Sequence, residues 1–164
     1  MTHDISSLIR SAVFVSDLQR STIFYRALGF TSVYFEGELD GPSTAAALKT
    51  PLTTTCRCRI LRPEGRPNFG MIGLFELTPA QEAIPRGDGP PRLGEVALVL
   101  YATPIHAAVE AARAAGASWS PDPSLFVMPH RQQYEVCLRD PDGVLINLID
   151  RPPSEQDRTA PVGG

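Results

Sequence analysis

Residues 134–150 read YEVCLRDPDGVLINLID and contain two β-strand patterns separated by a tight turn. The turn at 140–143 reads DPDG, in which proline presets φ and aspartate and glycine tolerate left-handed backbone. The strand pattern that follows, 144–149, is apolar except for Asn147. The sequence therefore predicts a pair of strands near its C-terminal end, with one amide among aliphatic side chains.

The same order of elements occurs twice in the chain. In the first half, a strand pattern at 9–15 precedes an N-cap aspartate and a helix pattern with one apolar side over 18–28. In the second half, a run of aliphatic and β-branched residues at 95–101 precedes Thr103 as N-cap and Pro104 at the first helical position. A glycine follows each helix pattern and is well placed to end it.

Extended patterns follow each helix, and a long loop is expected at 37–51. The extended patterns are 32–36, 54–61 and 71–77 in the first half, and residue 119, 126–128, 134–139 and 144–149 in the second. Each half therefore reads β-α-β-β-β, at a repeat offset close to half the chain. We predict an α+β fold of two tandem βαβββ modules.

The expected organisation is a single domain over residues 1–164. Within it, 8–78 is the first module and 95–150 is the second. Residues 79–94 are rich in proline and glycine and are predicted to be a linker. Residues 151–164 are polar, and we expect them to form a flexible tail.

Composition excludes several classes of function. The chain has 15 Lys and Arg residues and 18 Asp and Glu residues, which give a net charge of -3. Because its basic residues form no stripe, no nucleic-acid partner is expected. No apolar run reaches the ~18 residues of a membrane span and the N-terminus shows no signal pattern, so a cytoplasmic protein without a membrane partner is expected. Cys56 and Cys58 share one face of a strand pattern, but no second cysteine pair completes a zinc site.

Several short motifs resemble the vicinal oxygen chelate superfamily. The segment VSDLQRS at 15–21, with FY at 24–25 and LGF at 28–30, resembles its opening motif, and the turn at 140–143 with its apolar strand resembles its closing one. The superfamily includes glyoxalase I, extradiol dioxygenases, fosfomycin and bleomycin resistance proteins and methylmalonyl-CoA epimerase. The resemblance covers about residues 8–150. It implies a glyoxalase-like domain in which the two modules form curved sheets around a cavity, and it also implies a small-molecule ligand and a homodimer.

In metal-dependent members, His or Gln on the first strand and Glu on the last strand of each module hold one divalent ion. The resemblance places these positions on Arg10, Glu76, Glu95 or Val96, and Asn147. A guanidinium has no acceptor for a metal and repels a cation, and an amide is a weak ligand beside a carboxylate. We therefore expect no cofactor and no metal; if a divalent metal does bind, Glu76 and Glu95 are its expected ligands.

The leading hypothesis is a glyoxalase-like protein that acts on a small organic molecule by lyase or isomerase chemistry through an enolate. Arg10 and Asn147 would bind the substrate, and Glu76 or His130 would move a proton. One alternative is a non-catalytic binding protein like those of the bleomycin resistance branch. Another is a metal-dependent glyoxalase, epimerase or dioxygenase. His130 could instead lie in a surface hairpin that precedes the predicted strand pair.

Phe126 and Tyr134 are the aromatic residues expected to face the ligand, although aromatic side chains on strands are more often part of a core. The other candidates also have structural interpretations. Asn147 could bond to neighbouring backbone, and Glu76 could pair with Arg10 or face solvent. Arg10 could be an exposed edge residue if the register differs.

Overall fold

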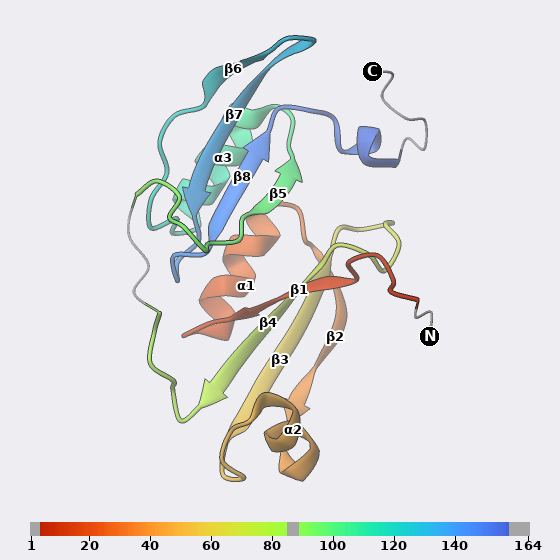
Figure 1. Ribbon diagram of the computed structural model, residues 1–164, viewed down its shortest axis with the longest axis vertical. Helices are drawn as coiled ribbons and strands as arrows, with labels where there is room; N and C mark the ends of the chain where they lie inside the picture. The colour runs from red at the N-terminus through yellow and green to blue at the C-terminus, as the bar shows by residue number, and fades with distance from the viewer. Residues whose placement is uncertain (1–3, 85–88, 158–164) are drawn as a thin grey trace. The chain divides into compact units, whose positions relative to one another are not determined.

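The computed structural model describes residues 4–84 and 89–157, and Figure 1 traces the chain. The chain forms two compact units, residues 1–86 and 87–164. The boundary between them falls inside the predicted linker, 79–94. Within the described residues, no helix is long and apolar enough to cross a membrane. The assignment of the whole chain to a single domain stays a prediction.

The first unit is one four-stranded sheet with two helices. Its strands lie in the order β1-β4-β3-β2, with β1 parallel to β4 and the other neighbours antiparallel. Its elements are β1 (Arg10–Phe14), α1 (Leu18–Ala27), β2 (Ser32–Leu39), α2 (Gly41–Leu48), β3 (Thr55–Arg62) and β4 (Met71–Thr78).

The second unit repeats this arrangement. Its strands lie in the order β5-β8-β7-β6, and β5 is parallel to β8. Its elements are β5 (Leu98–Tyr101), α3 (Ile105–Ala114), β6 (Ser124–Met128), β7 (Arg131–Arg139), β8 (Leu145–Ile149) and the short 3₁₀ helix η1 (Pro153–Asp157). The predicted α+β fold of two βαβββ modules is confirmed, and each described sheet is open rather than a closed barrel.

Two local predictions were wrong. Residues 37–51 are not a loop, because β2 continues to residue 39 and α2 follows, with a proline in its first turn. The helix in the second unit begins one residue later than predicted, because Pro104 is extended (ψ 136°) and serves as the N-cap. In the predicted tail, residues 153–157 form η1 and 158–164 lie outside the described residues, so its flexibility stays a prediction.

The start of α1 and the ends of both α1 and α3 agree with their sequences. The side chain of Asp17 accepts a hydrogen bond from the backbone N–H of Arg20 at 2.8 Å, which caps α1. Gly29 and Gly116 follow the two helices with φ of 97° and 94°, a conformation that glycine adopts without strain.

Each sheet has a face covered by a helix and an opposite face, which we call the open face. In the first sheet, α1 packs on β3 and β4. The side chains beneath it are nearly all buried: Val13, Leu61, Ile72 and Leu74. In the second sheet, the ring of Tyr134 on β7 lies near His106 of α3. Alternation along β7 and the register with β8 then place four further buried residues on the face toward α3: Val136, Leu138, Ile146 and Leu148. Because side chains alternate along a strand, the register fixes which residues reach each open face.

Candidate ligand-binding site

The open face of the first sheet is an apolar floor with aromatic side chains along it. Phe75 on β4 lies directly opposite Phe14 on β1 and Cys58 on β3. The rings of Phe14 and Phe75 are 5.7 Å apart between centroids. The floor is buried and consists of Cys56, Cys58, Ile60, Met71 and Phe75. Phe14 and Phe35 are 52% and 40% exposed, so aromatic surface remains available above the floor.

Two glycines on this open face make room for the rings. A Cβ atom placed on Gly73 would lie 2.9 Å from the ring of Phe75 and 3.6 Å from Cδ of Arg10. A Cβ atom on Gly37 would lie 3.1 Å from the ring of Phe35. The ring of Phe75 and the aliphatic stem of Arg10 therefore both lie against the bare backbone of β4. Arg10 is thus on the open face, beside the aromatic floor.

The guanidinium of Arg10 has no carboxylate partner within residues 4–84 and 89–157, and the residue is exposed. Its charge acts on the floor. Burial and the neighbouring Cys56 raise the pKa of the Cys58 thiol, Arg10 opposes them, and the resulting pKa is about 11. The two thiols are therefore protonated at neutral pH and behave as apolar floor.

The open face of the second sheet carries Asn147. The register places it between Val99 on β5 and Cys137 on β7. Its amide nitrogen is 3.4 Å from the carbonyl oxygen of Val136 and 3.6 Å from the sulfur of Cys137, which are both long contacts. In the described part of the chain its amide oxygen has no hydrogen-bond donor, so it is available to a ligand.

The same face holds a carboxylate that the sequence pattern did not single out. Glu135 lies two residues before Cys137 on β7, and Gln133 Nε2 donates a hydrogen bond to its Oε1 at 2.5 Å. Phe126 on β6 is directly opposite Gln133 and is 48% exposed. Cys137 on β7 is the cross-strand partner of Asn147. Because side chains alternate along a strand, Glu135 and Gln133 lie on the same face as Cys137, and this alternation is the signal that would have identified them.

Glu76 lies on the opposite face from Arg10. Its Oε2 accepts hydrogen bonds from the backbone N–H of Leu18 at 3.0 Å and from Arg57 Nη2 at 2.5 Å. A carboxylate there satisfies an orphan donor at the start of α1 and interacts favourably with the positive end of the helix. Glu76 therefore has a clear structural task, and its predicted role in proton transfer has no support from this placement.

Glu95 precedes β5 and forms an ion pair with Arg139. Its Oε1 is 2.8 Å from Arg139 Nη1, and this hydrogen bond, assisted by the backbone N–H of Arg92, lowers the pKa of the Glu95 carboxyl from 4.5 to about 2. Both carboxylates of the alternative metal set are thus bound to arginines. Among the described residues, no three His, Cys, Asp or Glu side chains gather to hold a metal ion. Carboxylates that are paired with arginines are poor metal ligands, and the absence of a resident metal stays a prediction.

The two remaining candidates lie away from the open faces. His130 is exposed in the turn between β6 and β7. Tyr134 pairs across the sheet with Leu125 and stacks near His106 of α3 at 6.0 Å between ring centroids, so it lies on the helix side. Phe126 and Tyr134 therefore face opposite sides of the second sheet.

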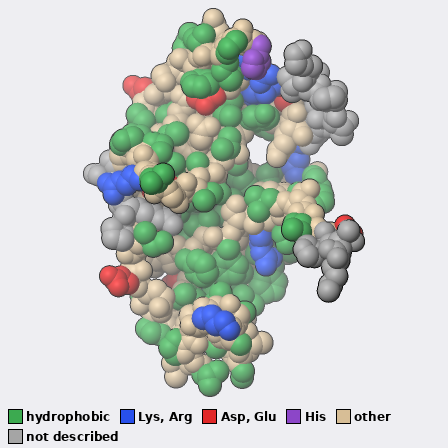
Figure 2. Space-filling view, in the orientation of Figure 1, with side chains coloured by type: hydrophobic (Ala, Val, Ile, Leu, Met, Phe, Trp, Pro, Cys, Tyr) green, Lys and Arg blue, Asp and Glu red, His purple; other side chains and the backbone are tan. Residues whose placement is uncertain are grey.

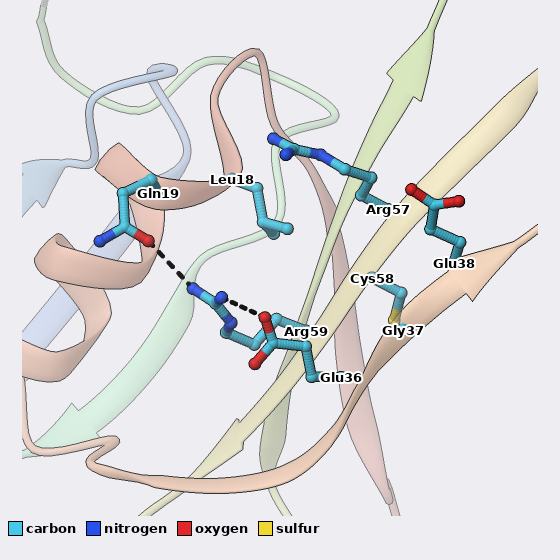
Figure 3. Close-up of a pocket in the computed structure, with 8 residues that line it drawn as sticks. All are labelled: Leu18, Gln19, Glu36, Gly37, Glu38, Arg57, Cys58 and Arg59. Atoms are coloured by element: carbon cyan, nitrogen blue, oxygen red, sulfur yellow. Dashed lines mark hydrogen bonds and ion pairs between the residues drawn. The ribbon is translucent and has the colours of Figure 1, made fainter.

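A polar pocket of about 240 Å³ lies at the start of α1, on the helix side of the first sheet (Figure 3). Arg59 donates to Gln19 Oε1 at 3.2 Å and to Thr22 Oγ1 at 2.9 Å, and it also pairs with Glu36. Arg57, the other cation on its wall, is paired with Glu76. Because both arginines are already paired with carboxylates of the protein, this pocket is a weaker candidate than the open faces.

Figure 2 shows hydrophobic side chains at the surface of both units, with charged ones scattered among them.

No family model matches the sequence, and no curated protein is similar to it. Solved structures do match: a glyoxalase family protein from Bacillus cereus superposes with a TM-score of 0.72 over 90% of this chain and 95% of its own, at 15% identity. The chain has the fold of this glyoxalase family protein.

Two further structures support this glyoxalase-like fold. The fosfomycin resistance protein FosX from Listeria monocytogenes matches with a TM-score of 0.54 at 15% identity, over 94% of this chain and all of its own. That structure is of a point mutant in complex with Mn(II) and a dihydroxypropylphosphonic acid. A glyoxalase/bleomycin resistance protein from Albidiferax ferrireducens matches with a TM-score of 0.52 at 22% identity over 87% and 97%. At these identities the similarity establishes the fold, and function must be argued from the residues.

Proposed function

We propose that this glyoxalase-like protein binds a small organic anion with an aromatic or otherwise apolar body on the open face of its first sheet. The observation that carries the proposal is Arg10, a guanidinium without a carboxylate partner in the described chain, lying beside the ring of Phe75. The exposed rings of Phe14 and Phe35 supply apolar contact area. A carboxylate, phosphonate or sulfonate would pair with Arg10 while the body of the ligand covers the rings.

The chemistry of this face favours binding over catalysis. Its floor consists of protonated thiols and hydrocarbon, and Glu76 is turned toward α1. No group on this face, among the residues described, is suited to take a proton from a substrate. The fosfomycin resistance relative was crystallised with an organic phosphonate, which is an anion of the proposed kind.

The test uses two fluorescent probes that share an aromatic body. Anilinonaphthalene sulfonate carries a negative charge, and N-phenyl-1-naphthylamine is neutral. We expect Arg10→Met to weaken binding of the sulfonate by at least about ten-fold, because a hydrogen bond to a charged group contributes about 1.5–3 kcal/mol. The neutral probe should bind equally to both proteins, since methionine keeps the apolar stem.

The matched control is Arg26→Met, which removes an exposed arginine from the last turn of α1. Circular dichroism of each variant checks that the fold is retained. Equal affinity of the wild type and Arg10→Met for the sulfonate would exclude the proposed site. Loss of sulfonate binding in Arg26→Met would show that only net charge matters.

A second candidate is lyase or isomerase chemistry through an enolate, and the observation in its favour is Glu135. This carboxylate lies on the open face of the second sheet, where the amide of Asn147 is available to hold a substrate oxygen. Glu135, rather than Glu76 or His130, would then move the proton. Exchange of the methyl protons of hydroxyacetone, a neutral ketone, into D₂O, followed by NMR, should be faster with the wild type than with Glu135→Gln if this is correct.

The proposal also includes a cytoplasmic homodimer that binds its ligand without a resident metal. Sedimentation equilibrium measures the mass of the assembly. Metal analysis of protein purified without chelator measures bound ions, and one tightly bound divalent ion per chain would contradict the metal-free proposal. FosX shows that this fold is compatible with Mn(II), so the measurement is decisive.

A further inference from the structure

We infer that the open face of the second sheet contains a separate site for a small organic cation with N–H donors, formed by Glu135, Gln133 and Phe126. All three residues belong to the second unit, on β6 and β7. The inference does not depend on Arg10 or on the proposed anion site, and the two can be tested independently.

The first observation is a carboxylate without a cation. Within the described part of the chain the one partner of Glu135 is the amide of Gln133, which occupies Oε1. The nearby arginine of this unit, Arg151, is already engaged by the hydroxyl and ring of Tyr101 and by Glu155. Arg131 lies four residues along the same strand, ~13 Å from Glu135. A negative charge on this face is thus left for a ligand to neutralise.

The second observation is an acceptor that is hidden from water and has no donor. The side-chain oxygen of Gln133 is buried, and no described donor reaches it. Its amide nitrogen is used by Glu135, and this fixes which end of the amide is the acceptor. Buried acceptors are almost always satisfied in proteins, so this oxygen calls for a donor that the described residues do not provide.

The third observation is an aromatic ring beside these acceptors. Phe126 pairs directly with Gln133 across β6 and β7 and is 48% exposed. The face of a phenyl ring attracts an organic cation, and the ring also provides apolar contact. Ser124 and Ile149, the cross-strand neighbours of Glu135, are uncharged, so they do not compete for its charge.

These three features together select the chemical class of the ligand. A carboxylate oxygen and an amide oxygen side by side match a group with two N–H donors, such as an amidinium or a primary ammonium. A hard metal ion would need several more oxygen ligands than one carboxylate and two amides supply. An organic anion would be repelled by Glu135.

The test is a titration with benzamidine, an aromatic amidinium, followed by isothermal calorimetry and by ¹H–¹⁵N NMR shifts. Benzamide is the neutral probe of the same shape, and benzoate is the anionic one. We expect saturable binding of benzamidine, at least ten-fold weaker binding of benzamide and benzoate, and amide shifts that are largest on β6 and β7. Glu135→Gln should weaken benzamidine binding at least ten-fold, and Phe126→Leu by a smaller factor.

The matched control is Glu110→Gln, which removes an exposed carboxylate from α3 in the same unit. It should leave the affinity for benzamidine unchanged. The inference is overturned if benzamidine does not bind, if benzamide binds as tightly, or if Glu135→Gln binds benzamidine like the wild type. Phe126→Leu, which keeps the charge, tests the site even if the carboxylate variant folds poorly.

Discussion

The ion pair between Arg139 and Glu95 gives the sharpest prediction about stability. Arg139 is fully buried, and its guanidinium donates to both carboxylate oxygens of Glu95 at 2.8 and 2.9 Å. It also donates to the backbone carbonyls of Gly89, Pro90 and Gly143. The pair therefore holds the segment that leads into β5 against the turn that leads into β8. Glu95→Ala should release this segment and leave the guanidinium without its counter-charge.

The size of the loss follows from the burial of Arg139. A buried guanidinium that loses its carboxylate costs about 3–5 kcal/mol in free energy of unfolding. The carbonyl groups that Arg139 retains would stabilise it in part, so we expect a loss near the lower limit, about 3 kcal/mol.

The assay is urea denaturation followed by the fluorescence of Trp119, the one tryptophan of the chain. Trp119 is a local reporter, because its carbonyl accepts a hydrogen bond from the N–H of Arg139 at 2.8 Å. The control is Glu110→Ala, which breaks an exposed pair with Arg113 and should cost only a small fraction of that loss. A loss below about 1 kcal/mol for the buried pair would refute the reasoning.

The pH dependence provides a second check on the same pair. The folded-state pKa of Glu95 is about 2, below its ordinary value of 4.5, because Arg139 stabilises the charged form. Its contribution is therefore fully present above pH 4.5 and is lost as the pH falls toward 2. The stability difference between the wild type and Glu95→Ala should shrink over that window. A difference that is constant from pH 5 to pH 2 would contradict this assignment.

Two further predictions concern the first unit, and a third concerns the whole protein. Gly73→Ala should weaken binding of anilinonaphthalene sulfonate in a fluorescence titration, because the added Cβ displaces the Phe75 ring and the Arg10 stem. Gly37→Ala should have less effect in the same titration, because its Cβ meets only the ring of Phe35. Glu76→Ala should lower the free energy of unfolding by about 1 kcal/mol through loss of the cap on α1, measured by urea denaturation with Glu38→Ala as the exposed control. Treatment with EDTA should leave the thermal midpoint unchanged, and a fall on chelation would reveal a structural metal.

Much of the fold could be predicted from the sequence, because strands and helices leave different periodic patterns. Apolar runs between glycine and proline gave most of the strands, and the DPDG turn placed the start of β8 within a residue. The helix α2 was missed because its Gly-Pro start is typical of a loop. Its Ser-Thr-Ala composition also lacks the contrast between apolar and polar positions that marks an amphipathic helix.

The site was harder to predict, because a one-residue change reverses the face of a strand. The resemblance pointed to Glu76 on β4 by its chemistry, but the register puts Phe75 on the open face and Glu76 on the helix face. In the same way, Phe126 pairs with Gln133 and not with Tyr134, so the two aromatic residues separate. The pairing of strands is a tertiary property that no local pattern contains.

Glu135 was missed for a different reason. The superfamily resemblance directs attention to the first and last strands of each module, and Glu135 lies on β7, the strand between the hairpin turn and β8. Its importance follows only from its neighbours, which the sequence does not reveal.

The neighbours Phe75 and Glu76 illustrate how tightly β4 is constrained in length. One side chain completes an apolar floor and the next anchors the start of a helix, on opposite sides of one strand. An insertion or deletion of a single codon within 71–76 would exchange the two, placing a charge among thiols and a phenyl ring against a helix end. The stretch at 63–70 has no strand register to preserve, so natural variants should differ in length there and stay uniform in β4.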